Sequence, residues 1–109
     1  MVDFLFLEHP IIDDDDWKVV EGDESAKSIL DLAISAYESC EFEPDELHRV
    51  TGEIAESVGR KLAKAQAPIR VAITGKRVGP PLFESMAILG REKVLERLRG
   101  ARSRLGRSG

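Results

Sequence analysis

The chain is short, of ordinary soluble composition and almost free of cysteine. It has 109 residues, of which 42% are hydrophobic and 33% are charged, and its net charge is −4, so we expect one small domain. No apolar run approaches the roughly 18 residues of a membrane span, and a single cysteine excludes an internal disulfide and fits a reducing compartment, so we expect a cytoplasmic protein without a membrane partner.

The beginning of the chain divides into an apolar run and an acidic run. Residues 4–7 are hydrophobic, and because an isolated domain has little reason to begin with them, we interpret residues 1–12 as the remnant of a junction with a preceding domain. The carboxylates of Asp13–Asp16 lead into a short predicted helix over about Asp16–Val20, whose free amides they would cap. Their spacing lacks the glycine and the distal glutamate of a calcium loop, so capping is favoured over a metal site.

Two longer helices are predicted next. The apolar residues between positions 26 and 37 recur at intervals of three and four residues, which indicates an amphipathic helix that begins after Asp23. Pro44 suits the first position of the following helix, whose apolar positions continue through Val58 to a stop at Gly59.

The segment between Arg60 and Gly75 is ambiguous. Arg60–Gln66 is predicted as a short polar helix or turn that ends before Pro68. Arg70–Thr74 has the residue preferences of a strand, yet Pro68 and Gly75 frame one or two helical turns. We favour helix because no partner strand is evident.

Two further helices are predicted in the last third of the chain. Pro81 opens one that Gly90 closes, and the other runs from Glu92 to about Ser103, with residues 106–109 as a disordered tail. Its basic side chains are expected to face outward: Arg91, Lys93, Arg97, Arg99, Arg102 and Arg104. The predicted fold is therefore all-α, a compact bundle of about five to six short helices over residues 13–105.

A basic, proline-containing corner lies between two short apolar stretches in this region. Lys76 and Arg77 supply positive charge, and the turn formed by Gly79, Pro80 and Pro81 is rigid. The two prolines offer carbonyl acceptors and have no amide hydrogens, so the corner suits a partner made of phosphates and exposed bases. An ordinary turn between helices with solvated charges explains the spacing equally well, and both interpretations stay open.

Charge is distributed unevenly along the chain. Residues 1–59 carry 17 acidic and 3 basic side chains, whereas residues 60–109 carry 3 acidic and 13 basic ones. An arginine-rich helix alone is ordinary surface, but together with this segregation it favours an electrostatic footprint for nucleic acid.

Side chains that could support catalysis or hold zinc are scattered. His9, Cys40 and His48 have separations that match no zinc motif, and nothing supplies a third group to orient a nucleophile and base. The basic corner also lacks the glycine pattern of a phosphate loop. We therefore expect no catalytic residue and no metal site.

The run from Pro68 to Leu98, PIRVAITGKRVGPPLFESMAILGREKVLERL, resembles the C-terminal anticodon-binding region of bacterial glutamyl-tRNA synthetases. That family shows an Arg-x-Ala-x-Thr-Gly element, a Gly-Pro turn followed by Leu-Phe-Glu, and a Leu-Gly-x-Glu tail before a last helix. The matching residues, in this order, are Arg70, Ala72, Thr74 and Gly75, then Gly79, Pro80, Leu82, Phe83 and Glu84, then Leu89, Gly90 and Glu92.

The resemblance implies an all-α domain that contacts the anticodon loop of the glutamate tRNA. Contacts to anticodon bases are implied at Gly79, Pro80 and Leu82, whereas roles for Lys76 and Arg77 are inferred from their charge. The candidate RNA-binding residues are Lys76, Arg77, Gly79, Pro80, Leu82, Arg70 and Arg91.

The resemblance further implies a parent enzyme, in which this domain is appended to a class I catalytic domain that joins glutamate to tRNA with ATP and magnesium. The ATP-binding signatures of that catalytic domain are missing from this sequence. We therefore expect no cofactor in this fragment and no aminoacylation by it alone.

An alternative of another class is a helical protein-interaction module. In that interpretation Phe4–Leu7 and the acidic half of the chain would dock onto a partner protein, because exposed clusters of large apolar residues often mark such surfaces.

Overall fold

The computed structural model describes residues 12–76, 79 and 81–108, with side chains up to Leu105. The prediction that Phe4–Leu7 dock onto a partner thus lies outside the described residues. Within them there are six helices and no strand, which confirms the all-α prediction. The helices are α1 (Asp14–Glu21), α2 (Ala26–Ser39), α3 (Pro44–Ser57), α4 (Leu62–Thr74), α5 (Leu82–Leu89) and α6 (Arg91–Ser108).

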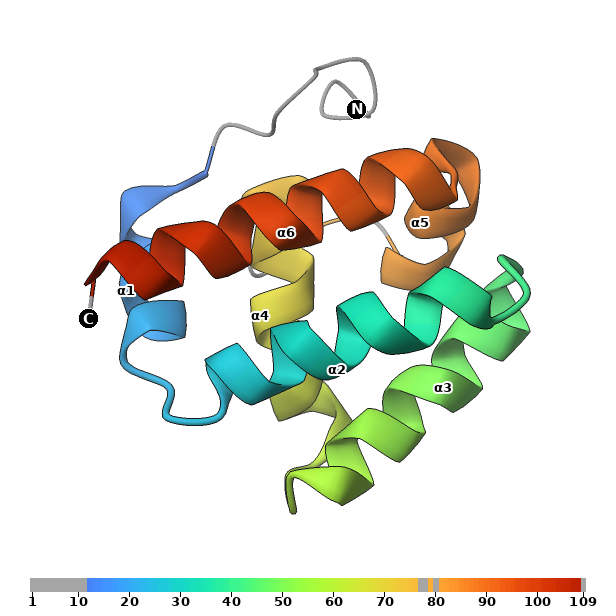
Figure 1. Cartoon of the computed structure of the whole chain (residues 1–109), viewed down its shortest axis with the longest axis horizontal. Coiled ribbons are helices and arrows are strands. Elements are labelled where there is room, and N and C mark those ends of the chain that lie inside the picture. Colours follow the sequence, from blue (N-terminus) through green and yellow to red (C-terminus); the bar gives the residue numbers. More distant parts are fainter. Residues whose placement is uncertain (1–11, 77–78, 80, 109) are drawn as a thin grey trace.

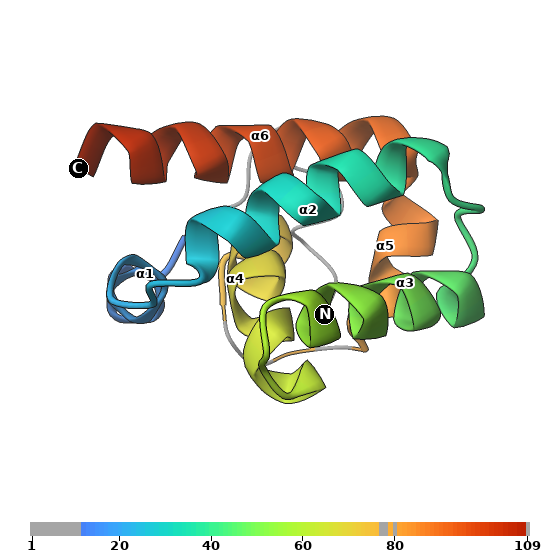
Figure 2. The ribbon, with the colours of Figure 1, turned by 60° about the horizontal axis from the view of Figure 1, so that its bottom comes forward.

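The centre of the bundle is α2, which packs against α3, α4 and α6. In Figures 1 and 2, α6 lies along α2 and runs in the opposite direction. The regular spacing of the apolar residues in α2 places Ile29, Leu30 and Tyr37 in the core, where none of the three is exposed. The predicted amphipathic helix is therefore confirmed.

The acidic residues before α1 cap it as predicted. The Asp13 carboxylate accepts a hydrogen bond from the backbone N–H of Asp16 (3.1 Å), and the helix begins at Asp14, two residues earlier than expected. The backbone N–H of Asp13 donates to the carbonyl of Gly75 (2.8 Å), which ties the start of α1 to the end of α4. Trp17 and Val20 form the inner face of α1, and both are buried.

The predicted interruption at Pro68 is wrong. Helix α4 continues through this proline, so Arg60–Gln66 and Arg70–Thr74 are not separate pieces, although the preference for helix over strand in the second piece is confirmed. A proline inside a helix costs about 3 kcal/mol. The buried stripe of α4 offsets this cost, and its members are Ala65, Pro68, Ile69, Ala72 and Ile73.

The prediction that every basic side chain of the last helix faces outward is also wrong for one residue. Arg97 is 2% exposed, because helical spacing places it on the same face as Val94, Leu98 and Ala101. Its Nη1 donates a hydrogen bond to the carbonyl of Ile73 (2.8 Å), one of the last carbonyls of α4, which have no partner within the helix.

The last helix is longer than expected. It runs to Ser108 instead of ending near Ser103, and so includes residues 106–108, which the sequence suggested were a disordered tail.

Ion pairs between α6 and α2 give the uneven charge of the sequence a structural role. Arg102 Nε lies 2.8 Å from Asp31 Oδ1, and Arg99 Nη2 lies 3.6 Å from Glu38 Oε2. These arginines belong to the basic half of the chain and their partners to the acidic half. Part of the charge segregation is thus accounted for by ion pairs that join the two halves of the fold.

Candidate nucleic-acid interface

The turn after α4 is held by a network of hydrogen bonds. The Thr74 hydroxyl lies 2.8 Å from the carbonyl of Arg70 and 3.0 Å from that of Lys76, and it accepts from the backbone N–H of Lys76 (3.3 Å). Gly75 adopts the left-handed conformation (φ 87°) that residues with a side chain avoid, and its N–H bonds to Val71 (2.9 Å). The start of the predicted basic corner is therefore fixed by the backbone of α4.

Two of the predicted RNA-binding residues are exposed in this turn, whereas Leu82 is not. Lys76 and Gly79 are exposed. Leu82 is 2% exposed, so most of its side chain belongs to the core. Arg77 and Pro80 lie outside the described residues.

The other two candidates, Arg70 and Arg91, lie on α4 and α6. Arg70 is half-buried, and its burial lowers the pKa of the guanidinium. Arg91 donates from Nε to the carbonyl of Tyr37 (3.1 Å) and from Nη2 to that of Cys40, and its guanidinium lies 5.4 Å from the ring centre of Phe42. Arg91 therefore caps the C-terminal end of α2, and none of its hydrogen bonds or ring contacts among the described residues is with the turn.

The interpretation of Pro81 as an open acceptor for bases is wrong. Its carbonyl accepts from both the backbone N–H (3.1 Å) and the hydroxyl (2.8 Å) of Ser85. Both lone pairs of a carbonyl oxygen are then in use. Pro81 therefore contributes its exposed ring, and not its carbonyl, to the surface.

A groove of about 340 Å³ lies where this turn enters α5. Its residues come from α3, α4 and the turn with α5: Pro44, Asp45, His48, Gln66, Pro81, Leu82, Phe83 and Glu84. The rings of His48 and Phe83 lie 5.2 Å apart between centroids and are inclined by 52°. We call this the turn groove. It combines aromatic surface with an amide and carboxylates, which are the groups that stack on bases and bond to their edges.

The sequence alone does not assign an RNA-binding role to three residues of the turn groove, His48, Gln66 and Phe83, although Phe83 belongs to the motif that carries the family resemblance. His48 and Phe83 are 35 positions apart, and only packing of α3 against α5 joins them. Gln66 lies four residues before Arg70 and thus near it on α4, a signal that is visible only if Pro68 is placed inside the helix.

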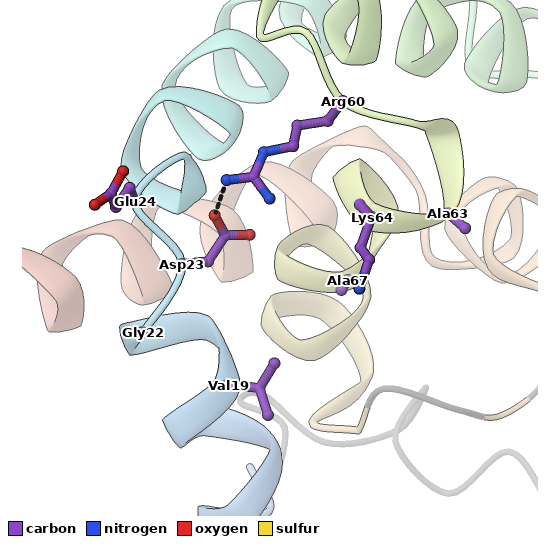
Figure 3. A pocket seen from close by; sticks show the side chains of 8 residues that line it. All are labelled: Val19, Gly22, Asp23, Glu24, Arg60, Ala63, Lys64 and Ala67. Carbon is purple, nitrogen blue, oxygen red and sulfur yellow. Dashed lines mark ion pairs between the residues drawn. The ribbon is translucent and has the colours of Figure 1, made fainter.

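A second groove, of about 590 Å³, lies between α1 and the first half of α4 (Figure 3). We call it the α1–α4 groove. Its walls are Val19, Gly22, Asp23, Glu24, Arg60, Ala63, Lys64 and Ala67. Arg60 Nη2 lies 3.3 Å from Asp23 Oδ1, and Asp23 Oδ1 also accepts the backbone N–H of Ser25 (2.8 Å).

Neither groove brings together the ligands of a metal site. Among the described residues, no group of three or more His, Cys, Asp or Glu side chains lies close enough to hold an ion. No described helix has the length and hydropathy to span a membrane.

Comparison with known proteins agrees with the resemblance seen in the sequence. Residues 1–102 match the family model described as an anticodon binding domain. The chain is 48% identical over 105 residues to a glutamate–tRNA ligase of Salinispora tropica, covering 95% of this chain and 22% of that protein. It is 42% identical over 110 residues to a glutamate–tRNA ligase of Thermobifida fusca, covering 99% of this chain and 23% of that protein. The chain thus spans less than a quarter of the length of these relatives.

The fold is found in a solved structure as well. A glutamate tRNA ligase from Elizabethkingia meningosepticum, crystallised in complex with its amino acid, superposes with a TM-score of 0.85 at 21% identity, over 94% of this chain and 20% of that one. The family match over nearly the whole sequence, together with this shared helical architecture, establishes that the chain belongs to the family of anticodon-binding domains.

Proposed function

We propose that this chain reads the anticodon of a glutamate tRNA as one domain of a glutamate–tRNA ligase. The observation that carries the proposal is the turn groove, which sets the tilted rings of His48 and Phe83 beside the turn that the family resemblance associates with anticodon bases. Unstacked bases bind to aromatic faces and to polar groups that bond to their edges. The turn groove provides both within one depression.

The residues around the turn have different roles in RNA binding. Lys76 and Arg77 hold phosphates, Gly79 and Pro80 approach the bases through the backbone, and Arg70 supports the RNA strand from α4. Leu82, with its side chain in the core, contributes through its backbone and by fixing the start of α5. Arg91 is hydrogen-bonded to the end of α2. It contributes to RNA binding either indirectly, by fixing where α6 begins, or directly, through the exposed part of its own side chain.

The parent enzyme in this proposal is cytoplasmic and joins glutamate to its tRNA with ATP and magnesium in its catalytic domain. Support comes from the relatives named glutamate–tRNA ligase, which are over four times as long as the matched region. The present domain supplies recognition, with tRNA and the catalytic domain of the parent chain as its partners.

A binding titration tests the base-reading role. The chain is titrated with glutamate tRNA and with the same tRNA carrying replaced anticodon bases. We expect at least tenfold weaker binding after replacement, equivalent to about 1.4 kcal/mol. His48→Ala should reduce this ratio, because stacking of one base contributes about 1 to 3 kcal/mol. Equal binding of both tRNAs at moderate salt would refute base reading.

A further inference from the structure

We propose that the α1–α4 groove is a second contact for the same RNA, in which Lys64 and the outer N–H groups of Arg60 bind the sugar-phosphate backbone. This inference rests on the proposed function and extends the RNA-binding surface beyond the turn. It concerns affinity and not base identity.

The first argument is the charge inside the groove. Asp23 is neutralised by Arg60 at 3.3 Å, and Figure 3 shows the Glu24 carboxylate pointing away from this ion pair. Lys64 is exposed and forms no ion pair with any residue in the described part of the chain. The groove therefore presents a lysine without a carboxylate partner among the described residues, together with the remaining donors of the Arg60 guanidinium, a combination suited to a phosphate.

Lys64 differs in this respect from six arginines of the domain. Arg49, Arg60, Arg99 and Arg102 pair with carboxylates, and Arg91 and Arg97 donate to carbonyl groups. These arginines are held by the fold. The lysine in the groove can bind an external anion without first breaking an ion pair within the described structure.

The second argument is continuity with the turn. Ala63, Ala67, Arg70 and Thr74 follow one another along α4 at intervals of three and four residues, so they share one face of the helix. The groove lies at the N-terminal end of this face and the turn at its C-terminal end. From Lys64 to Thr74, the last residue of α4, the distance along the helix axis is about 15 Å, a span that a few nucleotides of one RNA strand cover.

The third argument is the shape of the groove. Three of its lining residues, Gly22, Ala63 and Ala67, are small, and in Figure 3 the Lys64 side chain extends along α4 toward Ala67. The small residues beside Lys64 therefore leave room for a phosphate next to its ammonium group.

The test uses Lys64→Gln with Lys93→Gln as a charge-matched control on exposed α6. The probe is an RNA hairpin that carries the glutamate anticodon loop, together with the same hairpin carrying replaced anticodon bases. Affinities are measured between about 0.05 and 0.3 M salt. Each contact to a phosphate of a single strand contributes about −0.7 to the slope of log K against log salt, so Lys64→Gln should flatten the slope by about 0.7 and weaken binding about fivefold at 0.1 M.

The outcomes separate this inference from the proposed function. An equal loss of affinity for both hairpins in Lys64→Gln, with no change in Lys93→Gln, supports a backbone contact. Unchanged affinity and slope in Lys64→Gln, with anticodon discrimination intact, would overturn the inference and leave the proposed function standing. A loss confined to the hairpin with the native anticodon would also overturn it, since Lys64 would then read bases. Absence of discrimination in the unmodified chain would instead refute the proposed function.

Discussion

Arg97 Nη1 donates to the carbonyl of Ile73 at 2.8 Å and thereby holds the last turn of α4 from the side of α6. Burial lowers the pKa of this guanidinium, yet arginine stays charged in proteins. The bond fixes the carbonyl just before Thr74 and Gly75, which begin the turn. A buried charge thus stabilises the helix end from which the candidate RNA-binding turn starts.

Replacement of Arg97 should destabilise the domain. Arg97→Ala loses a charged hydrogen-bond donor, worth about 1.5 to 3 kcal/mol, and the packing of the side-chain stem. We expect urea unfolding to show a loss of about 2 to 4 kcal/mol. The control is Arg99→Ala, whose ion pair with Glu38 is exposed and worth at most about 1 kcal/mol. Equal losses in the two variants would contradict the role given to Arg97.

Two glycines should respond to alanine in opposite directions. Gly75 has φ 87° at the end of α4, where alanine should cost about 1 to 2 kcal/mol. Gly100 lies inside α6, is exposed and would place its new Cβ within 4 Å of no other atom outside its own helix, so alanine should stabilise by about 0.5 to 1 kcal/mol. Denaturant unfolding of both variants measures the difference. A stabilising Gly75→Ala would show that the turn can adopt another conformation.

The arginines that face α2 should matter little for RNA. Arg99 and Arg102 already pair with Glu38 and Asp31. We expect Arg99→Gln with Arg102→Gln to leave the affinity for the anticodon hairpin within about twofold, whereas Lys76→Gln should weaken it about fivefold at 0.1 M salt through one lost phosphate contact. Filter binding or fluorescence anisotropy measures the hairpin affinity of the unmodified chain, the double arginine variant and Lys76→Gln. A larger loss in the double variant would restore the basic face of α6 as an RNA-binding surface.

The single tyrosine predicts an alkaline limit to stability. Burial raises the pKa of Tyr37 well above its ordinary value of about 10, although its hydrogen bond with Thr51 opposes the shift. The unfolded chain therefore releases this proton at a lower pH than the folded one. The contribution to stability is complete below about pH 10 and is lost as the pH rises toward the folded-state pKa.

Unfolding experiments between pH 8 and 11 test this expectation, with ultraviolet absorbance reporting tyrosinate and circular dichroism reporting the helices. Tyr37→Phe should remove part of the alkaline loss. At neutral pH it should cost only about 1 kcal/mol, since the Thr51 hydroxyl keeps its bond to the carbonyl of Leu47 (2.7 Å). Tyrosinate that forms near pH 10 while the helices stay folded would contradict the burial effect.

The helices were largely predictable because their signals are local. Capping by Asp13, the start at Pro44 and the left-handed stops at Gly59, Gly75 and Gly90 can each be read from neighbouring residues. Pro68 could not be placed correctly, because its cost is offset by partners elsewhere in the core. The outward prediction for Arg97 failed for a similar reason, since a charge in a helical pattern gives no sign of a carbonyl on another helix that will accept its hydrogen bond.

The candidate site was predictable only in part. The basic corner is visible as a run of residues, and Lys76 and Gly79 are exposed as that run suggests. The turn groove is not visible, because its aromatic pair joins α3 to α5 and its amide comes from α4. The same is true of the ion pairs between α2 and α6: the sequence reveals two oppositely charged halves, but only the fold shows that they face each other.

The position of α6 in the chain has a consequence for how the domain is made. It is the final helix of the sequence, yet it covers α2, α4 and α5 and supplies the arginines that neutralise Asp31 and Glu38. A nascent chain that has not yet emerged through α6 would leave the face of α2 that packs against α6 open to water, and would leave Asp31 and Glu38 without these arginine partners. The domain can therefore complete its core on the ribosome only after α6 has emerged and packed against α2, α4 and α5.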